Sequence, residues 1–94
     1  MAKTNEVGFL AYSKAGRDRD RLFLIVGMAD TRTALIADGR LRKVGMPKKK
    51  KLKHLTIVSD SSAECRQRIL SGQLTDAFVR RTLEQSDGES DDLI

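Results

Sequence analysis

Catalytic and metal-binding side chains are scarce in this sequence of 94 residues, which has one histidine, one cysteine and no tryptophan. A zinc site needs about four Cys or His ligands at set spacings, and the glycine patterns of phosphate- and dinucleotide-binding loops are missing as well. The two candidates, His54 and Cys65, fall on different predicted elements. We therefore expect no enzyme activity, no metal site and no cofactor, with His54 an ordinary strand residue and Cys65 a small apolar contact.

A disulfide framework is excluded too, because a lone cysteine has no partner within the chain. Small secreted domains are usually stabilised by disulfide bonds. In addition, the N-terminus lacks the apolar core of a signal peptide. The longest apolar run, Leu22 to Met28, is too short to cross a bilayer. We expect a soluble, cytoplasmic protein with a single small core.

Charge is distributed unevenly along the chain. Residues 1–58 contain 14 lysines and arginines against 5 acidic residues, a net charge of +9. Residues 59–94 contain 4 against 8, a net charge of −4, and the two parts together give the +5 of the whole chain. A basic body with an acidic C-terminal third predicts a polyanionic partner for the body.

Short runs of β-forming residues separated by turn signals predict five strands, which are Val7–Ser13, Arg21–Met28, Thr33–Ala37, Arg40–Val44 and Leu52–Val58. The second is expected to be a central strand buried on both faces. Asp38 and Gly39 form the strongest hairpin signal, and the lysine run 48–51 is expected to be a loop. Strands this short favour a small, strongly bent barrel over an open sheet, since closure removes the edge strands.

The pattern changes after Ser59, where two short helices are expected. Ser61 and Glu64 have the spacing of a capping box, Gly72 is a C-terminal stop signal, and a second helix start follows at Thr75. Helices of about ten residues are marginal alone in water, so these pack on the barrel, on each other or on a partner. The chain is therefore divided into a β unit, 1–58, a helical appendage, 59–85, and a disordered acidic tail, 86–94.

Basic side chains concentrate in three segments of the expected barrel. They are Lys14, Arg17, Arg19 and Arg21 in and beside the first loop, Arg40, Arg42 and Lys43 after the Asp-Gly turn, and Lys48, Lys49, Lys50, Lys51 and Lys53 after Pro47. Arginine grips phosphate oxygens with a planar fork and lysine adds a mobile charge, a combination that suits a nucleic-acid backbone. Each segment alone is also compatible with a solvated surface, and the lysine run with a patch that binds anionic membranes. Three such segments on one small barrel favour a polyanionic partner.

The segments VGFLAYSKAGRDRDRLFLIVG, ALIADGRLRKV and MPKKKKLKHL, in this order, resemble the KOW-motif family. The likeness is to small bacterial KOW-domain RNA-binding proteins related to a large-subunit ribosomal protein of archaea and eukaryotes, and it covers about residues 6–56. It implies an SH3-like β-barrel and RNA contact through the first loop, with Gly16 at the motif glycine, followed by the charged residues 17–19 and the strand 22–26. The glycine would let the backbone approach phosphates closely. Many KOW motifs have a second glycine where this chain has Asp20, and Leu22 or Phe23 fills another glycine position.

We therefore expect a non-enzymatic RNA-binding protein, associated with the ribosome or its RNA, that contacts the phosphates of structured RNA through its basic loops. Because exposed aromatic residues are few, we expect stacking on unpaired bases to be weak, and Tyr12 is the one residue to test for it. The main alternative is a protein–protein adaptor whose C-terminal helices bind a protein, with RNA binding secondary. The acidic tail folding back on the basic loops is a further hypothesis. Attachment of the lysine run to a membrane lacks the support of a lipid site or a basic amphipathic helix.

Overall fold

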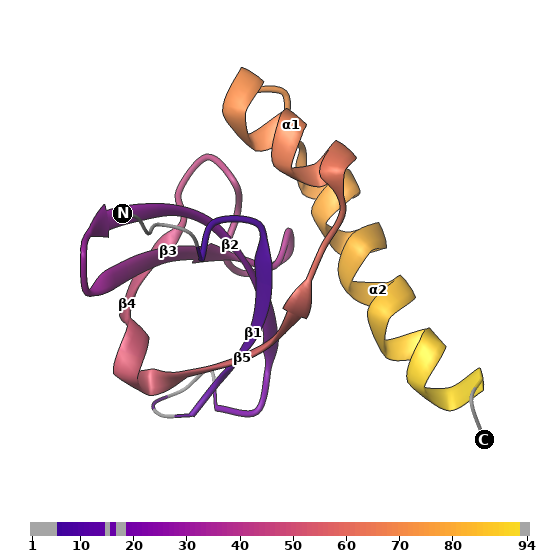
Figure 1. The fold of residues 1–94 in the computed structure, drawn as a ribbon, viewed down its shortest axis with the longest axis horizontal. Helices are drawn as coiled ribbons and strands as arrows, with labels where there is room; N and C mark the ends of the chain where they lie inside the picture. Colours follow the sequence, from indigo (N-terminus) through magenta and orange to yellow (C-terminus); the bar gives the residue numbers. More distant parts are fainter. Residues whose placement is uncertain (1–5, 15, 17–18, 93–94) are drawn as a thin grey trace.

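The computed structural model describes residues 6–14, 16 and 19–92, with side chains described through residue 86. Five strands form one antiparallel sheet, and two helices follow it (Figure 1). The strands are β1 (Phe9–Ser13), β2 (Leu22–Asp30), β3 (Thr33–Ala37), β4 (Lys48–Lys51) and β5 (Leu55–Asp60), with a 3-10 turn, η2 (Leu52–His54), between the last two. The helices are α1 (Ala63–Ser71) and α2 (Asp76–Asp92).

The sheet is strongly curved, and its strand order is β4-β3-β2-β1-β5. The pairing of β2 with β3 shifts register between Ile25 and Gly27, and the pairing of β1 with β5 shifts between Leu10 and Ala11. Such irregularities bend a strand and increase its twist. The two edge strands, β4 and β5, are consecutive in the chain and are connected by η2 (Figure 1).

One hydrophobic core lies on the concave side of the sheet. It consists of buried side chains from four strands: Ala11, Phe23, Ile25, Ala34, Ile36 and Leu55. Ile36 of β3 and Leu55 of β5 join the same cluster although two strands separate β3 from β5, which requires the sheet to curve around it. Phe9, Met28 and Leu52 pack against this cluster from its margins.

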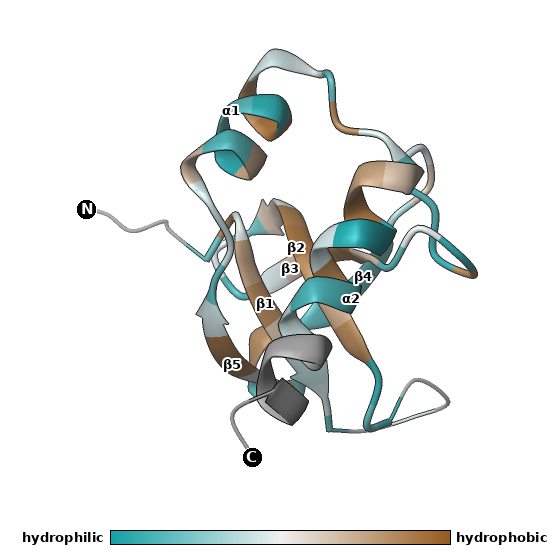
Figure 2. Cartoon of the chain, turned by 90° about the vertical axis from the view of Figure 1, so that its right-hand side faces the viewer, coloured by the Kyte–Doolittle hydropathy of each residue, from teal (hydrophilic) through white to brown (hydrophobic). Residues whose placement is uncertain are grey.

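A second core lies on the outer face, where the helices cover β1 and β2 (Figure 2). Its buried members are Leu10, Leu24, Cys65, Val79 and Leu83. Because β2 supplies residues to both cores, the prediction of a central strand buried on both faces is confirmed. Cys65 is an apolar contact, as expected. Sheet and helices share this core, so the helical segment packs as part of the same unit.

The predicted fourth strand, 40–44, is wrong, because this segment belongs to a loop between β3 and β4. Asp38 does not open a tight hairpin. Its buried carboxylate accepts the backbone N–H groups of Arg40 and Arg42, each at 2.9 Å. These bonds wrap the loop around Asp38 and use the N–H groups that a strand would have offered to a neighbour.

The lysine run predicted as a loop is in fact the strand β4. It pairs with β3 in the register Ile36↔Lys48 to Thr33↔Lys51. Paired residues of an antiparallel ladder share a face, so Lys48 and Lys50 lie on the side of the buried Ile36 and Ala34, and both are half-buried. Their aliphatic stems can cover apolar surface while the charged ends reach water.

The helix boundaries follow local capping signals, with one shift. Ser62, not Ser61, caps α1, because its Oγ accepts the backbone N–H of Cys65 at 3.1 Å. Gly72 ends α1 in the left-handed conformation, as predicted, and Thr75 Oγ1 accepts the N–H of Phe78 at the start of α2. The helix α2 then continues to Asp92, where a disordered tail was expected from residue 86 onward. Within the part of the chain described, neither helix is both long and apolar enough to cross a membrane.

Candidate nucleic-acid interface

Three segments that are distant in sequence meet around η2. The backbone N–H of Lys14 donates to the carbonyl of His54 at 2.7 Å, which ties the first loop to this turn. On the other side, the N–H of Leu52 donates to the carbonyl of Arg32 at 2.8 Å, which ties in the turn between β2 and β3. Figure 1 shows η2 at the lower left, between the first loop and the β2–β3 turn.

This juxtaposition gathers cations from all three segments. Gly16 lies close to β4, since a Cβ added to it would be 3.5 Å from the Nζ atom of Lys50. Lys51, Arg32 and Lys53 line a shallow groove of about 210 Å³ beside η2. We call the whole set the basic rim, which comprises Lys14, Arg19, Arg32, Lys50, Lys51 and Lys53.

The first loop is held by backbone bonds that fix the position of Arg19. The N–H of Arg19 donates to the carbonyl of Gly16 at 3.3 Å, and Arg19 forms an isolated β-bridge with Ser13. The N–H of Asp20 donates to the Ser13 carbonyl at 2.8 Å. The predicted contact residue Arg17 lies outside the described residues.

Two positions of this loop have left-handed backbone. Gly16 has φ of +78°, and Asp20 has φ of +69°. An L-residue in this region costs about 1–2 kcal/mol relative to glycine, with Asp and Asn the most tolerant side chains. The conformation therefore gives a physical reason why glycine suits position 20, and Asp is among the residues that can replace it.

The arginines on the other side of the loop are paired with acidic side chains. Arg21 contacts the buried carboxylate of Asp38 at 3.5 Å, and Arg40 contacts Glu84 of α2 at 2.9 Å. In addition, Arg80 of α2 donates to the carbonyl of Gly39 at 2.7 Å. The bonds of Arg40 and Arg80 attach the loop 38–47 to α2, and the contact of Arg21 with Asp38 attaches it to the start of β2. Arg21 and Arg40 therefore have a structural role that was not predicted from the sequence.

The remaining predicted contact residues are divided among several surfaces. Arg42 is half-buried in the loop 38–47, and Lys43 is exposed on the same loop, outside the basic rim. Within β4 the lysines alternate, with Lys48 on the concave side and Lys49 on the outer side, opposite Leu35. The structure therefore brings residues of the first and third predicted basic segments together. The second segment, 40–43, lies apart from them, in the loop that is bonded to α2.

The two arginines of α1 are also compensated. The guanidinium of Arg66 donates to Asp60 and holds the pKa of that carboxyl below its usual value, and Arg68 pairs with Glu64 at 3.3 Å. By contrast, the side chains of Lys14, Arg19 and Lys53 form no ion pair within the described part of the chain. Near the rim, Asp30 accepts the backbone N–H of Arg32, which lowers the pKa of its carboxyl. The basic rim thus keeps an excess of positive charge.

Arg32 is a member of the rim that sequence reasoning missed. It stands alone in a turn, without the neighbouring cations that marked the other segments. Its place in the rim depends on the bond between its carbonyl and Leu52, twenty residues later in the chain. No local sequence signal reports a contact of this kind.

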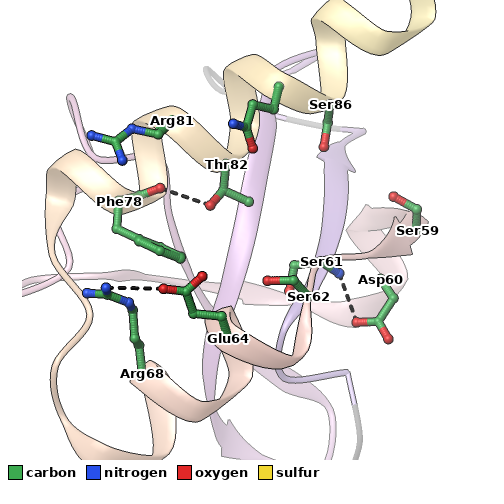
Figure 3. Close-up of a pocket in the computed structure, with 11 residues that line it drawn as sticks. Ser59, Asp60, Ser61, Ser62, Glu64, Arg68, Phe78, Arg81, Thr82 and Ser86 are labelled. Carbon is green, nitrogen blue, oxygen red and sulfur yellow. Dashed lines mark hydrogen bonds and ion pairs between the residues drawn. The ribbon is translucent and has the colours of Figure 1, made fainter.

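A larger groove of about 520 Å³ lies between α2 and the link from β5 to α1 (Figure 3). Its lining is mostly polar, and its two arginines, Arg68 and Arg81, are balanced by the carboxylates of Asp60 and Glu64. The guanidinium of Arg68 lies 4.4 Å from the centre of the Phe78 ring and pairs with Glu64. Figure 3 shows Arg68 below the ring of Phe78, with its guanidinium directed towards Glu64. This groove therefore offers less free charge than the basic rim.

His54 and Cys65, the two residues considered for catalysis or metal binding, lie in different elements. His54 lies in η2 rather than in a strand, and Cys65 of α1 is buried in the outer core, where burial raises the pKa of its thiol. Within the described residues, no three His, Cys, Asp or Glu side chains gather in a way that could hold a metal ion.

No protein-family model matches the chain, and no curated protein sequence matches it closely.

Proposed function

We propose that this chain is a non-enzymatic RNA-binding protein that holds the phosphate backbone of structured RNA on the basic rim. The observation that supports this most is the convergence of cations from three segments on η2, while four arginines elsewhere, Arg21, Arg40, Arg66 and Arg68, are paired with carboxylates. Lysine and arginine side chains of this kind release counterions from a polyanion, which supplies most of a sequence-independent affinity.

We also propose that the fold is a closed SH3-like barrel of the KOW type. The curved five-stranded sheet, the concave core and the 3-10 turn between the two edge strands support it. The left-handed backbone at Gly16 and Asp20 supports the resemblance further, because both are positions where KOW motifs have glycine. The resemblance favours RNA, and association with the ribosome in the cytoplasm, over other polyanions.

The adaptor alternative has weaker support. Cys65 from α1 and Val79 and Leu83 from α2 pack against the sheet in the outer core, whereas Leu70 of α1 is 82% exposed. The helices therefore have an intramolecular partner for these side chains, and no further protein is needed to cover them.

The test is a titration of the purified protein with structured RNA over a range of salt concentrations. If four to six phosphates are engaged, log K should fall against log salt with a slope of about −3 to −5. A flat slope would contradict the electrostatic proposal.

Matched double variants locate the contact. Replacing Lys14 and Lys53 with Ala should reduce the magnitude of the slope by about 1.5, since each lost phosphate contact contributes about 0.7–0.9. The control replaces Lys43 and Arg81 with Ala, which removes the same charge from exposed positions outside the rim. Equal effects of the two pairs would mean that binding follows net charge rather than the basic rim.

A further inference from the structure

Tyr12 stands on the outer face of the sheet, immediately before the first loop. Its backbone neighbours are Leu22 of β2 on one side and Thr56 of β5 on the other. The helix α2 covers this face at Leu10, while Tyr12 remains 37% exposed. The ring therefore lies at the margin between the outer core and the basic loop.

Tyr12 is the one exposed aromatic residue in the part of the chain described. Phe23 is fully buried. The half-buried rings of Phe9 and Phe78 each have a guanidinium over them, from Arg66 at 5.8 Å and from Arg68 at 4.4 Å. Within the same residues, no arginine covers Tyr12 in this way, so its ring can still take a stacking partner.

Two grooves meet at Tyr12, and their charges differ. The groove towards η2, of about 440 Å³, is lined by Tyr12, Ser13, Lys14, Arg19, Asp20 and Thr56. It has two cations and one carboxylate. The groove towards α2, of about 450 Å³, has three arginines and three carboxylates in its lining, and ion pairs join Arg21 to Asp38 and Arg40 to Glu84. Surplus positive charge therefore lies only on the η2 side of the ring.

We propose that an unpaired base of the bound RNA stacks on Tyr12, with its adjoining phosphates on Lys14 and Arg19. This inference rests on the proposed RNA-binding function and specifies the substrate, namely structured RNA that presents a single-stranded nucleotide next to the contacted backbone. Lys14 follows Tyr12 by two residues, and the bridge between Arg19 and Ser13 places the second cation beside it. Aromatic rings with flanking cations are the usual platform for unpaired bases.

The sequence provides a direct probe of this contact. Tyr12 is the only tyrosine and the chain has no tryptophan, so the intrinsic fluorescence of the protein reports this one ring. Titration with short single-stranded RNA should quench the emission. Inorganic polyphosphate, which has charge but no bases, should bind the protein and quench the tyrosine emission little. Equal quenching by both at saturation would overturn the stacking proposal.

Two substitutions separate stacking from charge. Tyr12→Leu should weaken binding of labelled single-stranded RNA by about 5- to 100-fold, while its affinity for polyphosphate stays unchanged. Tyr12→Phe, which keeps a ring, should retain the affinity for RNA. If RNA binds with the expected salt slope but Tyr12→Leu binds it as well as the native protein, stacking is refuted and the proposed function stands. If neither RNA nor polyphosphate binds, both proposals fail.

Discussion

Replacing Gly39 with alanine should detach the loop 38–47 from α2. Gly39 has φ of +78°, and an added Cβ would lie 2.5 Å from the backbone oxygen of Asp76 and 2.9 Å from Cγ of Arg80. The first of these atoms belongs to the helix backbone and cannot rotate away. The loop must therefore move, although hydrogen bonds of Gly39, Arg40 and Val44 fix it to α2.

The expected loss of stability has two parts. The left-handed conformation costs an alanine about 1–2 kcal/mol. Displacing the loop also breaks the bond from Arg80 to the Gly39 carbonyl at 2.7 Å and the bond from the Val44 N–H to Asp76 at 2.8 Å. At about 0.5–1.5 kcal/mol for each bond, the free energy of unfolding should fall by about 2–5 kcal/mol, a large share of the stability of a small domain.

Urea unfolding followed by far-UV circular dichroism measures this loss, and two other glycines provide controls. Gly72 has nearly the same φ, +76°, but open space around it, so Gly72→Ala should show the conformational cost alone. Gly45 has neither a positive φ nor a neighbour within 4 Å, and Gly45→Ala should change stability little. If Gly39→Ala were no more destabilising than Gly72→Ala, the docking of this loop on α2 would be refuted.

Two further predictions concern Asp20 and Cys65. Asp20→Gly should strengthen RNA binding, because it removes a carboxylate beside the basic rim, and weaker binding in the same salt titration would contradict this. Asp20→Ala should lower the free energy of unfolding by about 1 kcal/mol, because alanine adopts the left-handed region poorly. The buried Cys65 thiol, whose pKa is raised, should react slowly with a thiol reagent at pH 8 and quickly in urea. Fast labelling of the native protein would contradict the packing of α1.

Local signals in the sequence were enough to predict β1, β2, the end of α1 and the start of α2. The alternation of Leu10 and Ala11 and the continuous apolar run of β2 assign their faces directly, and Gly72 and Thr75 act on the turn in which they stand. Each of these features depends on neighbours in the chain. The mainly β class follows from them, because it requires only that several short segments be strands.

The features that were missed depend on distant partners. Lysine has low β propensity, so nothing within the run 48–51 indicates a strand, and β4 exists because β3 offers it a ladder. The segment 40–44 has the pattern of a strand, but its backbone N–H groups donate to the side chains of Asp38 and of Asp76 in α2 instead of to a neighbouring strand. In the candidate site, Lys14, Gly16 and the lysines near η2 had been named as contact residues from the sequence, and the structure places them close together. The pairing of Arg40 with Glu84 and the position of Arg32 depend on contacts that only the folded chain makes.

The position of β1 between β2 and β5 sets the order in which the chain can fold as it is synthesised. Leu10 pairs with Leu24 early, but its cover on the outer face comes from residues as late as Leu83. At about 5–20 residues per second, roughly 3–12 seconds separate the synthesis of Leu24 from that of Leu83. During those seconds the outer side of the first hairpin presents an apolar surface to water, and the growing chain is then most exposed to aggregation.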